Sequence, residues 1–559
     1  MMNKWLKRIG IFLLSILGVI LLLLLSMGLY IHFFCQQEAP DVVAYQGAKT
    51  YQIQQDSGLT KYGPNWFRES NSGLYEMYVE GNPYERGLAI GQMSKPLIQY
   101  QEEVFTAQLR HLIPATWYLN FLKYVIGWFN RNIGDDIPEE FKVEILGVSK
   151  AASEEFDFIS PPYGRMLNYH AAHDIGHALQ NMALVGCTSF ATWGKASADS
   201  SLIIGRNFDF YVGDDFAKNK IIAFYKPERG IPFMMVTFGG MTGVLSGMNA
   251  LGLTLTLNAA KSEIPGSAAT PISLIAREVL QYASTIEEAN QIIQKRHSFV
   301  AESFMIGSAK DGKAALIEKT PSVQARFDAP ANRLISTNHF QSKDLGTSPL
   351  NLEFMANSST VYRYDKVLEL LRADSINTVT KTARILRDQK GLEGKDIGMG
   401  NEKSINQLIA HHSIIFQPEK GKVWISTAPW QLGKYVCYDL NKIFAMRMDK
   451  NQEIAETSLE IPQDSFVMTN QYANAVKFNS YRFPFSLGEQ LNPDSIIAWN
   501  PNSYHAYLLA GKEWEKEGQF AKAQQAFSRG LGKEIASKQE EAFMKEHMEH
   551  CDQEIQKQK

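Results

Sequence analysis

The sequence predicts an α+β fold in which helices pack against stacked antiparallel sheets. The pattern behind this prediction is that blocks of short strands alternate with paired helices. A long uncharged run at the N-terminus predicts a separate helix outside these layers. With 559 residues, 45% hydrophobic and 21% charged, the chain is long enough for a large core and smaller modules. The expected parts are a stub and anchor (1–35), an upstream helical lead-in (36–186), the main domain (187–450), a connector (451–500) and a helical tail (501–559).

The first element is an apolar run over residues 9–34, with Lys4, Lys7 and Arg8 before it. A run of this length can span a bilayer, whereas the apolar core of a cleaved signal peptide has only about 7–15 residues and precedes small residues. We therefore interpret it as a retained single-pass transmembrane helix, with a cleaved signal peptide as the alternative. The basic flank predicts a cytoplasmic N-terminus and an extracytoplasmic main domain.

The next segment reads as helical from residue 88 to 180, and the pattern switches to strands directly after Gly186. The strands expected there cover 188–193, 201–210, 221–225, 233–238, 243–248 and 253–258. The last of these alternates between apolar and polar residues, which places Asn258 on a polar face.

The second half of the main domain returns to helices, the second of which has Ser284 and Glu287 at capping-box spacing. The expected elements are helices at 272–283 and 286–296, strands at 303–308, 314–318 and 333–337, helices at 359–372 and 379–388, and strands at 413–417 and 422–426.

The tail has the spacing of a single tetratricopeptide unit, in which small residues let two antiparallel helices approach and aromatic residues fill the gap. The residues are Tyr507, Gly511, Trp514, Gly518, Ala523 and Phe527. One repeat cannot bury its own face, so we expect the tail to pack on the main domain. Binding of a protein partner is the alternative.

Composition excludes several classes of function. A net charge of −3 leaves no broad basic surface, so nucleic acid is not an expected partner. The chain has neither a phosphate-binding glycine loop nor a GxSxG elbow. Its cysteines are widely spaced and lack a CxxC pair, which argues against a zinc knuckle and a disulfide scaffold: Cys35, Cys187, Cys437 and Cys551.

Two groups of histidines are candidate metal ligands. The first group lies beside Asp174 and has i, i+3, i+7 spacing: His170, His173 and His177. The second group lies near the C-terminus: His547, His550 and Cys551. Neither group has an HExxH motif or an evident further ligand, so structural roles are expected and no metal site is predicted.

Cys187 is the candidate nucleophile. A lone cysteine is more often a small buried hydrophobic residue, so the evidence for a nucleophile must come from its neighbours. Cys187 follows Gly186 and opens a predicted strand, and the next strand brings Arg206 and Asp209. Because these two residues are three apart, they face opposite sides of a regular strand, so a bulge or a strand end must separate them.

Five short motifs follow one another in a fixed order along the chain, at 186–190, 205–210, 247–258, 336–340 and 358–363. A further stretch, 81–87, lies upstream of them. They resemble the acyl-coenzyme A:6-aminopenicillanic-acid acyltransferase family and the related choloylglycine hydrolases, which are N-terminal-nucleophile enzymes. The resemblance runs over about residues 75–445. It implies an αββα sandwich and self-cleavage between Gly186 and Cys187.

The resemblance also implies catalytic roles. The arginines would favour the thiolate and set the field of the site, the aspartate would hold the new α-amine, and the asparagines would donate to the oxyanion or fix the amine. The residues are Cys187, Arg206, Asp209, Asn258, Asn338 and Arg363. A free α-amine titrates near pH 8, so it can serve as the base for its own thiol.

The expected function is hydrolysis or transfer of the acyl group of a small N-acyl or peptide-like substrate, through a thioester and without a cofactor. No residue decides whether water or an amine takes the acyl group. The alternative is a catalytically silent, membrane-tethered scaffold that binds a partner through its tail.

Overall fold

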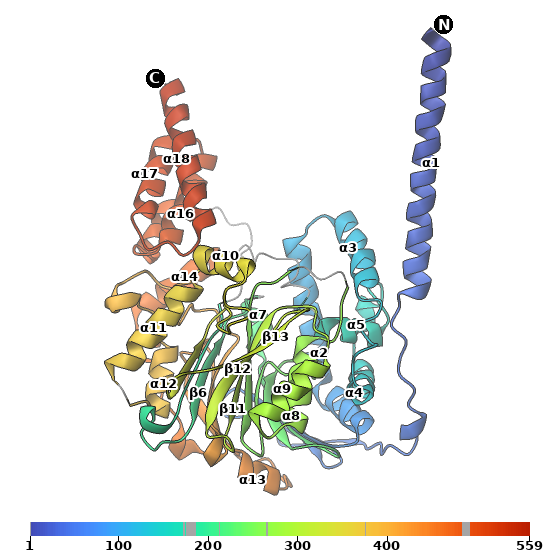
Figure 1. Ribbon diagram of the computed structural model, residues 1–559, viewed down its shortest axis with the longest axis vertical. Helices are drawn as coiled ribbons and strands as arrows, with labels where there is room; N and C mark the ends of the chain where they lie inside the picture. Colours follow the sequence, from blue (N-terminus) through green and yellow to red (C-terminus); the bar gives the residue numbers. More distant parts are fainter. Residues whose placement is uncertain are drawn as a thin grey trace.

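The computed structural model describes residues 2–171, 174, 186–211, 213–263, 267–374, 376–482 and 492–558. In these residues two sheets stack face to face and helices cover their outer faces (Figure 1). Side chains of both sheets meet between them, among them Ile204 and Ile414 from one and Phe224 and Met305 from the other. The layer order is therefore helix, sheet, sheet, helix, and the α+β prediction is confirmed.

The larger sheet contains eleven strands of the described chain, in the order β1-β2-β3-β4-β7-β8-β9-β10-β11-β12-β13. They are Ile53–Asp56, Leu59–Tyr62, Asn65–Glu69, Tyr75–Gly81, Ile221–Pro227, Phe233–Thr237, Ser246–Asn249, Leu253–Ala259, Glu302–Ser308, Lys313–Lys319 and Gln324–Asp328. Neighbours are antiparallel except β4 and β7, which are parallel. Four strands precede Cys187, so the upstream segment is part of the sandwich as well as a helical lead-in.

The smaller sheet has the order β14-β5-β6-β15-β16-β17, all antiparallel. The strands are Arg333–Ser336, Thr188–Thr192, Ile203–Phe208, His412–Gln417, Lys422–Ser426 and Tyr435–Asp439. Strand β5 begins directly after Cys187. Strand β6 ends at Phe208, so Asp209 lies outside the strand. Its side chain can therefore face the same side as Arg206, as the predicted roles of both residues require.

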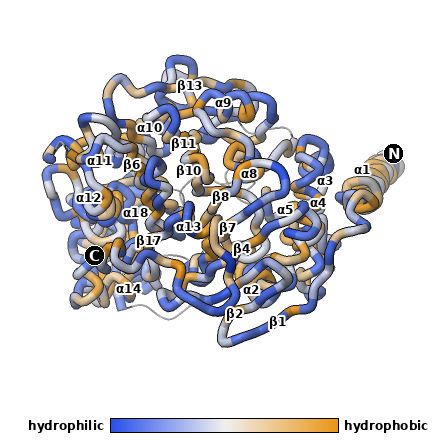
Figure 2. The backbone as a smooth tube through the Cα atoms, turned by 90° about the horizontal axis from the view of Figure 1, so that it is seen from below, coloured by the Kyte–Doolittle hydropathy of each residue, from blue (hydrophilic) through white to orange (hydrophobic). Residues whose placement is uncertain are grey.

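Helices on the larger sheet's side are α2, α4, α5, α8 and α9, and those on the smaller sheet are α11 and α12 (Figures 1 and 2). Their bounds are Pro83–Leu112, Glu139–Ser149, Pro162–His170, Ile272–Tyr282, Ile286–Lys295, Thr360–Ala373 and Val379–Leu386. The predicted capping box of α9 was wrong by one residue: Thr285 caps the helix and Glu288 reciprocates, because the helix begins at Ile286.

The tail consists of α16, α17 and α18, at Tyr504–Lys516, Phe520–Leu531 and Lys538–Gln558, preceded by α14 (Asn470–Arg482) and α15 (Pro493–Trp499). A Cβ at Gly511 would overlap the ring of Phe527, which explains the small residue in this spacing. The Tyr504 hydroxyl donates to Glu402 at 3.2 Å, and Lys403 pairs with Glu534 at 2.6 Å. These contacts confirm that the tail packs on the main domain.

The N-terminal helix α1 (Met2–Phe34) projects from the body and is coloured mostly as hydrophobic (Figures 1 and 2). Its stretch Lys7–Ile31 is long and apolar enough to cross a membrane, the one such helix in the described residues, and none of that stretch's most apolar window is buried. A signal sequence near the N-terminus passes the same test of length and composition.

Candidate active site

Cys187 lies immediately before β5 with its side chain buried. Its Sγ is 3.8 Å from Nη2 of Arg206 and 3.8 Å from the main-chain oxygen of Asp209. The same oxygen accepts a hydrogen bond from the Gly186 amide at 3.1 Å. The chain after β6 therefore runs beside the Gly186–Cys187 bond and holds it next to the Arg206 guanidinium.

The carbonyl oxygen of Gly186 accepts two hydrogen bonds from buried side chains. Nη1 of Arg363 donates at 2.8 Å and Nε2 of Gln407 at 2.9 Å. This is the carbonyl that a thiol must attack to cleave the bond before Cys187, and the two donors polarise it as an oxyanion hole does. No sequence signal identified Gln407, because it lies in a loop far along the chain and outside the recognised motifs.

Gly186 is required for space. A Cβ at this position would overlap Nε2 of Gln407. Gly186 is not one of the described residues that have a positive φ. A left-handed backbone conformation is therefore not the reason for glycine at this position. The absence of a side chain instead lets the Gln407 amide reach the carbonyl.

Arg363 lies in the first turn of α11 and is fully buried. Besides Gly186, its Nη1 donates to the Cys187 carbonyl at 2.6 Å and to Oγ1 of Thr188 at 2.9 Å, and its Nη2 donates to Oδ1 of Asn338 at 2.7 Å. The resemblance implied that this arginine sets the field of the site, and the structure places its side chain in contact with both residues of the bond.

Arg206 points between the two sheets from β6. Its guanidinium donates to the Leu245 carbonyl at 3.2 Å, to the hydroxyl of Ser246 and to the Leu257 carbonyl, and it stacks 4.3 Å from the ring centroid of Phe208. These contacts fix the positive charge beside Cys187.

Burial dominates the electrostatics of the site. It raises the pKa of the Cys187 thiol to about 11, against the opposing effect of Arg206, so the uncut chain holds a protonated thiol. It raises the pKa of Asp209 to about 7, although Arg363 and Arg206 act in the other direction. Neither carboxylate oxygen of Asp209 has a hydrogen-bond partner among the residues described. A positive charge placed next to this buried carboxylate would stabilise its ionised form, so Asp209 is suited to bind a cation.

The two predicted asparagines connect strands around the nucleophile. Asn258 donates to the carbonyls of Ser336 at 2.9 Å and Thr337 at 3.2 Å, and it accepts from the Ser189 hydroxyl at 3.0 Å. Asn338 donates to the Ala259 carbonyl at 2.9 Å. These contacts tie β10 to β5 and β14, while the predicted donation to an oxyanion remains a prediction.

An apolar cavity of about 60 Å³ lies beside Arg206. Leu245 and Phe208, which both contact the Arg206 guanidinium, belong to its lining. The other walls are largely apolar: Phe105, Met166, Phe210, Phe216, Phe238 and Met241, with Gln101, Glu102, Tyr169 and His170. The cavity therefore presents a mainly aromatic surface beside two residues that contact Arg206.

His170 has a structural role, as expected. Thr242 donates its amide to Nε2 at 2.9 Å, Nδ1 lies 2.8 Å from the Met166 carbonyl, and burial lowers the pKa of the imidazole to about 4. His173 and His177 lie outside the described residues. Asp174 accepts the amide of Ile272 at 2.7 Å.

Two curated proteins are similar to part of this chain. An uncharacterized protein of Archaeoglobus fulgidus is 24% identical over 264 residues, which are 44% of this chain and 43% of that protein. Protein dcd1B of Dictyostelium discoideum is 23% identical over 271 residues, which are 45% of this chain and 51% of that protein. The matched stretch thus spans about half the length of these relatives.

Three solved structures are similar at low identity. They are the Caenorhabditis elegans ortholog of N-acylethanolamine-hydrolyzing acid amidase (17% identity, TM-score 0.32, 42% of this chain and 93% of that one), a mutant of Clostridium perfringens conjugated bile acid hydrolase (16%, 0.33, 48% and 96%) and Agrobacterium tumefaciens penicillin V acylase (15%, 0.30, 46% and 87%). TM-scores of this size are too low to establish a common fold, so the layer order above stands on this chain's own strands and helices.

The family model described as acyl-coenzyme A:6-aminopenicillanic acid acyl-transferase matches residues 196–429. Cys187 lies just before this region. Inside it are the other residues of the site: Arg206, Asp209, Asn258, Asn338, Arg363 and Gln407. The resemblance that the motifs predicted is therefore confirmed: over residues 196–429 this chain matches the acyl-coenzyme A:6-aminopenicillanic acid acyltransferase family.

Proposed function

We propose that this protein is an amide-bond hydrolase or acyltransferase whose nucleophile, Cys187, becomes an N-terminal residue when the chain cleaves itself after Gly186. The observation that carries the proposal is the pair of side-chain donors on the Gly186 carbonyl, with the buried Cys187 thiol beside it. An ordinary structural cysteine does not need a polarised carbonyl on the preceding residue. The family match over 196–429 supports the same reaction class.

Self-cleavage begins when Sγ of Cys187 bonds to the carbonyl carbon of Gly186. The charge that develops on the carbonyl oxygen is stabilised by the N–H groups of Arg363 and Gln407. The C–N bond then breaks, the Cys187 nitrogen takes a proton, and a thioester remains. Water hydrolyses this thioester, which releases the Gly186 carboxylate and the Cys187 thiol.

The new α-amine of Cys187 completes the site. Its proton-bound form is a cation, and the Asp209 carboxylate, which has no hydrogen-bond partner in the described part of the uncut chain, is the group that would receive it. Arg363 donates to the Cys187 carbonyl as well, a bond that cleavage leaves in place, so the new terminus stays fixed. In its neutral form the amine takes the thiol proton, and the resulting thiolate attacks the substrate.

The substrate reaction repeats this chemistry on a second amide. The thiolate attacks the acyl carbon, the leaving amine takes the proton held by the α-amine, and a thioester on Cys187 results. Water then gives the free acid, or an amine gives a new amide. The apolar cavity beside Arg206 favours a substrate whose acyl group is hydrophobic or aromatic.

The test is to incubate the processed protein with a series of N-acyl amides that differ only in the acyl group, and to quench the reaction with acid. The expected result is an acyl mass on the fragment that begins at Cys187, with faster turnover for aromatic than for polar acyl groups. A Phe238→Ala variant should reduce that preference. Absence of any acyl adduct and of any turnover across the series would contradict the proposal.

We also propose that α1 is a retained membrane anchor. Helix α3 (Thr116–Phe129) contacts α1 and exposes aromatic side chains, including Trp117 at 75% and Phe121 at 52% exposure. Aromatic residues of this kind concentrate at membrane interfaces. Membranes washed at alkaline pH should retain the uncut Cys187→Ala chain, whereas its release into the supernatant with α1 still attached would refute the anchor.

A further inference from the structure

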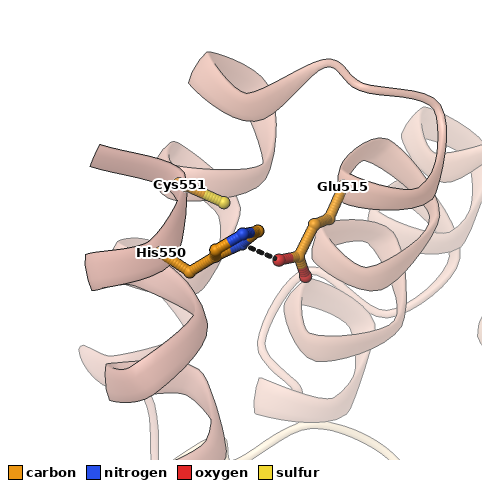
Figure 3. Close-up of side chains that lie close together, drawn as sticks. All are labelled: Glu515, His550 and Cys551. Atoms are coloured by element: carbon orange, nitrogen blue, oxygen red, sulfur yellow. Dashed lines mark hydrogen bonds and ion pairs between the residues drawn. The ribbon is translucent and has the colours of Figure 1, made fainter. Parts of the chain in front are cut away.

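A second cluster of chemically reactive side chains lies in the tail, far from Cys187 in sequence. It joins Glu515 of α16 to His550 and Cys551 of α18 (Figure 3). One ligand atom of each residue, a carboxylate oxygen, a ring nitrogen and the sulfur, lies within 4.8 Å of the others. Nδ1 of His550 is 2.8 Å from Oε1 of Glu515.

A fourth residue reaches the same carboxylate. Nδ1 of His547 lies 2.7 Å from the second oxygen of Glu515. His547 and Cys551 are one helical turn apart on α18, so both side chains lie on the face that meets α16. Cys551 is fully buried, whereas His550 is half exposed, so the cluster is closed on its sulfur side and open on its imidazole side.

The donor set is the one that zinc prefers. Thiolate, imidazole and carboxylate are its protein ligands, and a tetrahedral site needs four groups at about 2.0–2.3 Å from the ion. Two histidine–glutamate pairs would explain the imidazole contacts alone. They do not explain why the thiol side chain of Cys551 also converges on this point, as Figure 3 shows.

The surroundings of His550 fit the same chemistry. Oε1 of Glu554, one turn further along α18, lies 3.9 Å from Nε2 of His550. Histidines that bind a metal through one ring nitrogen commonly present the other to a carboxylate, which orients the ring and raises its basicity. Glu554 is placed for that supporting role.

We propose that Glu515, His550 and Cys551 bind a zinc-class divalent cation, that His547 orients Glu515 through its second carboxylate oxygen, and that the ion fastens α18 to α16. Binding forms a metal–sulfur bond and releases the Cys551 proton to solvent, while His550 binds as a neutral imidazole. The tail is a small module with a single tetratricopeptide-like unit, and small modules commonly gain stability from a structural metal. The spacing on α18 could not predict the site because Glu515 comes from another helix.

The experiment uses the full-length chain in detergent with the background substitutions Cys187→Ala, Cys35→Ser and Cys437→Ser, which leave Cys551 as the one thiol of the chain. The protein is stripped with a chelator, and Zn²⁺ affinity is then measured by competition with a chromogenic chelator. We expect one ion per chain. Cys551→Ser and His550→Ala should weaken binding more than Glu554→Gln, for which a loss of about 10–100-fold is expected. Glu549→Gln, an exposed neighbour on α18, is the matched control and should bind normally.

A second measurement does not depend on the folding of variants. Co²⁺ added to the stripped protein of the same background should give the charge-transfer absorption of a thiolate–cobalt bond, and Zn²⁺ should abolish it. Helix α18 should also melt at a higher temperature with Zn²⁺ than without. The proposal is overturned if cobalt gives no thiolate band, or if Cys551→Ser binds Zn²⁺ as tightly as its parent while its tail remains helical.

Discussion

Replacing Gln407 with alanine should slow cleavage of the Gly186–Cys187 bond without preventing the chain from folding. Gln407 is buried, and its Nε2 donates to the Gly186 carbonyl at 2.9 Å. The substitution removes one of the two side-chain donors on this oxygen and leaves Arg363 in place. The bond strengthens as negative charge develops on the oxygen, so its loss should affect the transition state more than the starting state.

The magnitude follows from comparable sites. Loss of one donor from a buried oxyanion hole lowers the rate by about 10²–10³-fold, or about 2.7–4 kcal/mol. The assay is the appearance of the two fragments over time, followed by intact mass after translation is stopped. Gln431→Ala is the matched control, because Gln431 is equally buried but donates to the Leu386 carbonyl instead. Cleavage of Gln407→Ala at the wild-type rate, with the control also normal, would refute the role assigned to this amide.

Three further predictions concern the same site. Gly186→Ala should slow cleavage at least as much as Gln407→Ala, because its Cβ displaces the Gln407 amide, and normal cleavage by mass would contradict this. Arg363→Lys should lower the cleavage rate by about 10²-fold or more, since lysine lacks the planar fork that donates to the Gly186 and Cys187 carbonyls and to Asn338 together; a thermal melt checks that the variant is folded. In an uncut Cys187→Ala chain, Asp209→Asn should stabilise the fold. The pKa of Asp209 is raised from 3.8 to about 7, so between these pH values unfolding releases its proton. The free energy of unfolding of the Asp209 chain therefore falls as pH rises from about 4 to 7. Above pH 7 the Asn variant should be more stable than the Asp209 chain by at most about 4 kcal/mol. Urea melts at pH 4 and pH 8 measure it, and an equal difference between the two proteins at both pH values would refute the assignment.

Much of the fold could be predicted from local pattern. The alternation of β10 and the strand that opens after Cys187 were visible in the sequence. Both strands are buried on both faces, so the period of two in β10 comes from leucines on one face and hydrogen-bonded polar side chains on the other. Two edge strands, β13 and β17, were not predicted, since each is only five residues long and lacks clear alternation. The contribution of β1–β4 to the larger sheet was also missed. The parallel pairing of β4 with β7 joins segments far apart in sequence, which no local pattern reports.

The site shows the same limit. Cys187, Arg206 and Asp209 could be found because they lie within short motifs, and the structure brings them together around one bond. The contact of Arg363 with Gly186 could not be predicted, since it depends on how α11 packs against β5. Gln407 carried no signal at all, because a buried loop glutamine acquires its role only from the carbonyl it faces.

The most direct test of the central claim is the intact mass of the purified chain and of its Cys187→Ala variant, prepared side by side. Self-cleavage predicts two wild-type fragments, the second beginning with Cys187, and an uncut variant. A wild-type chain that stays whole under conditions where it is folded, or a Cys187→Ala chain that is cut at the same bond, would contradict the account.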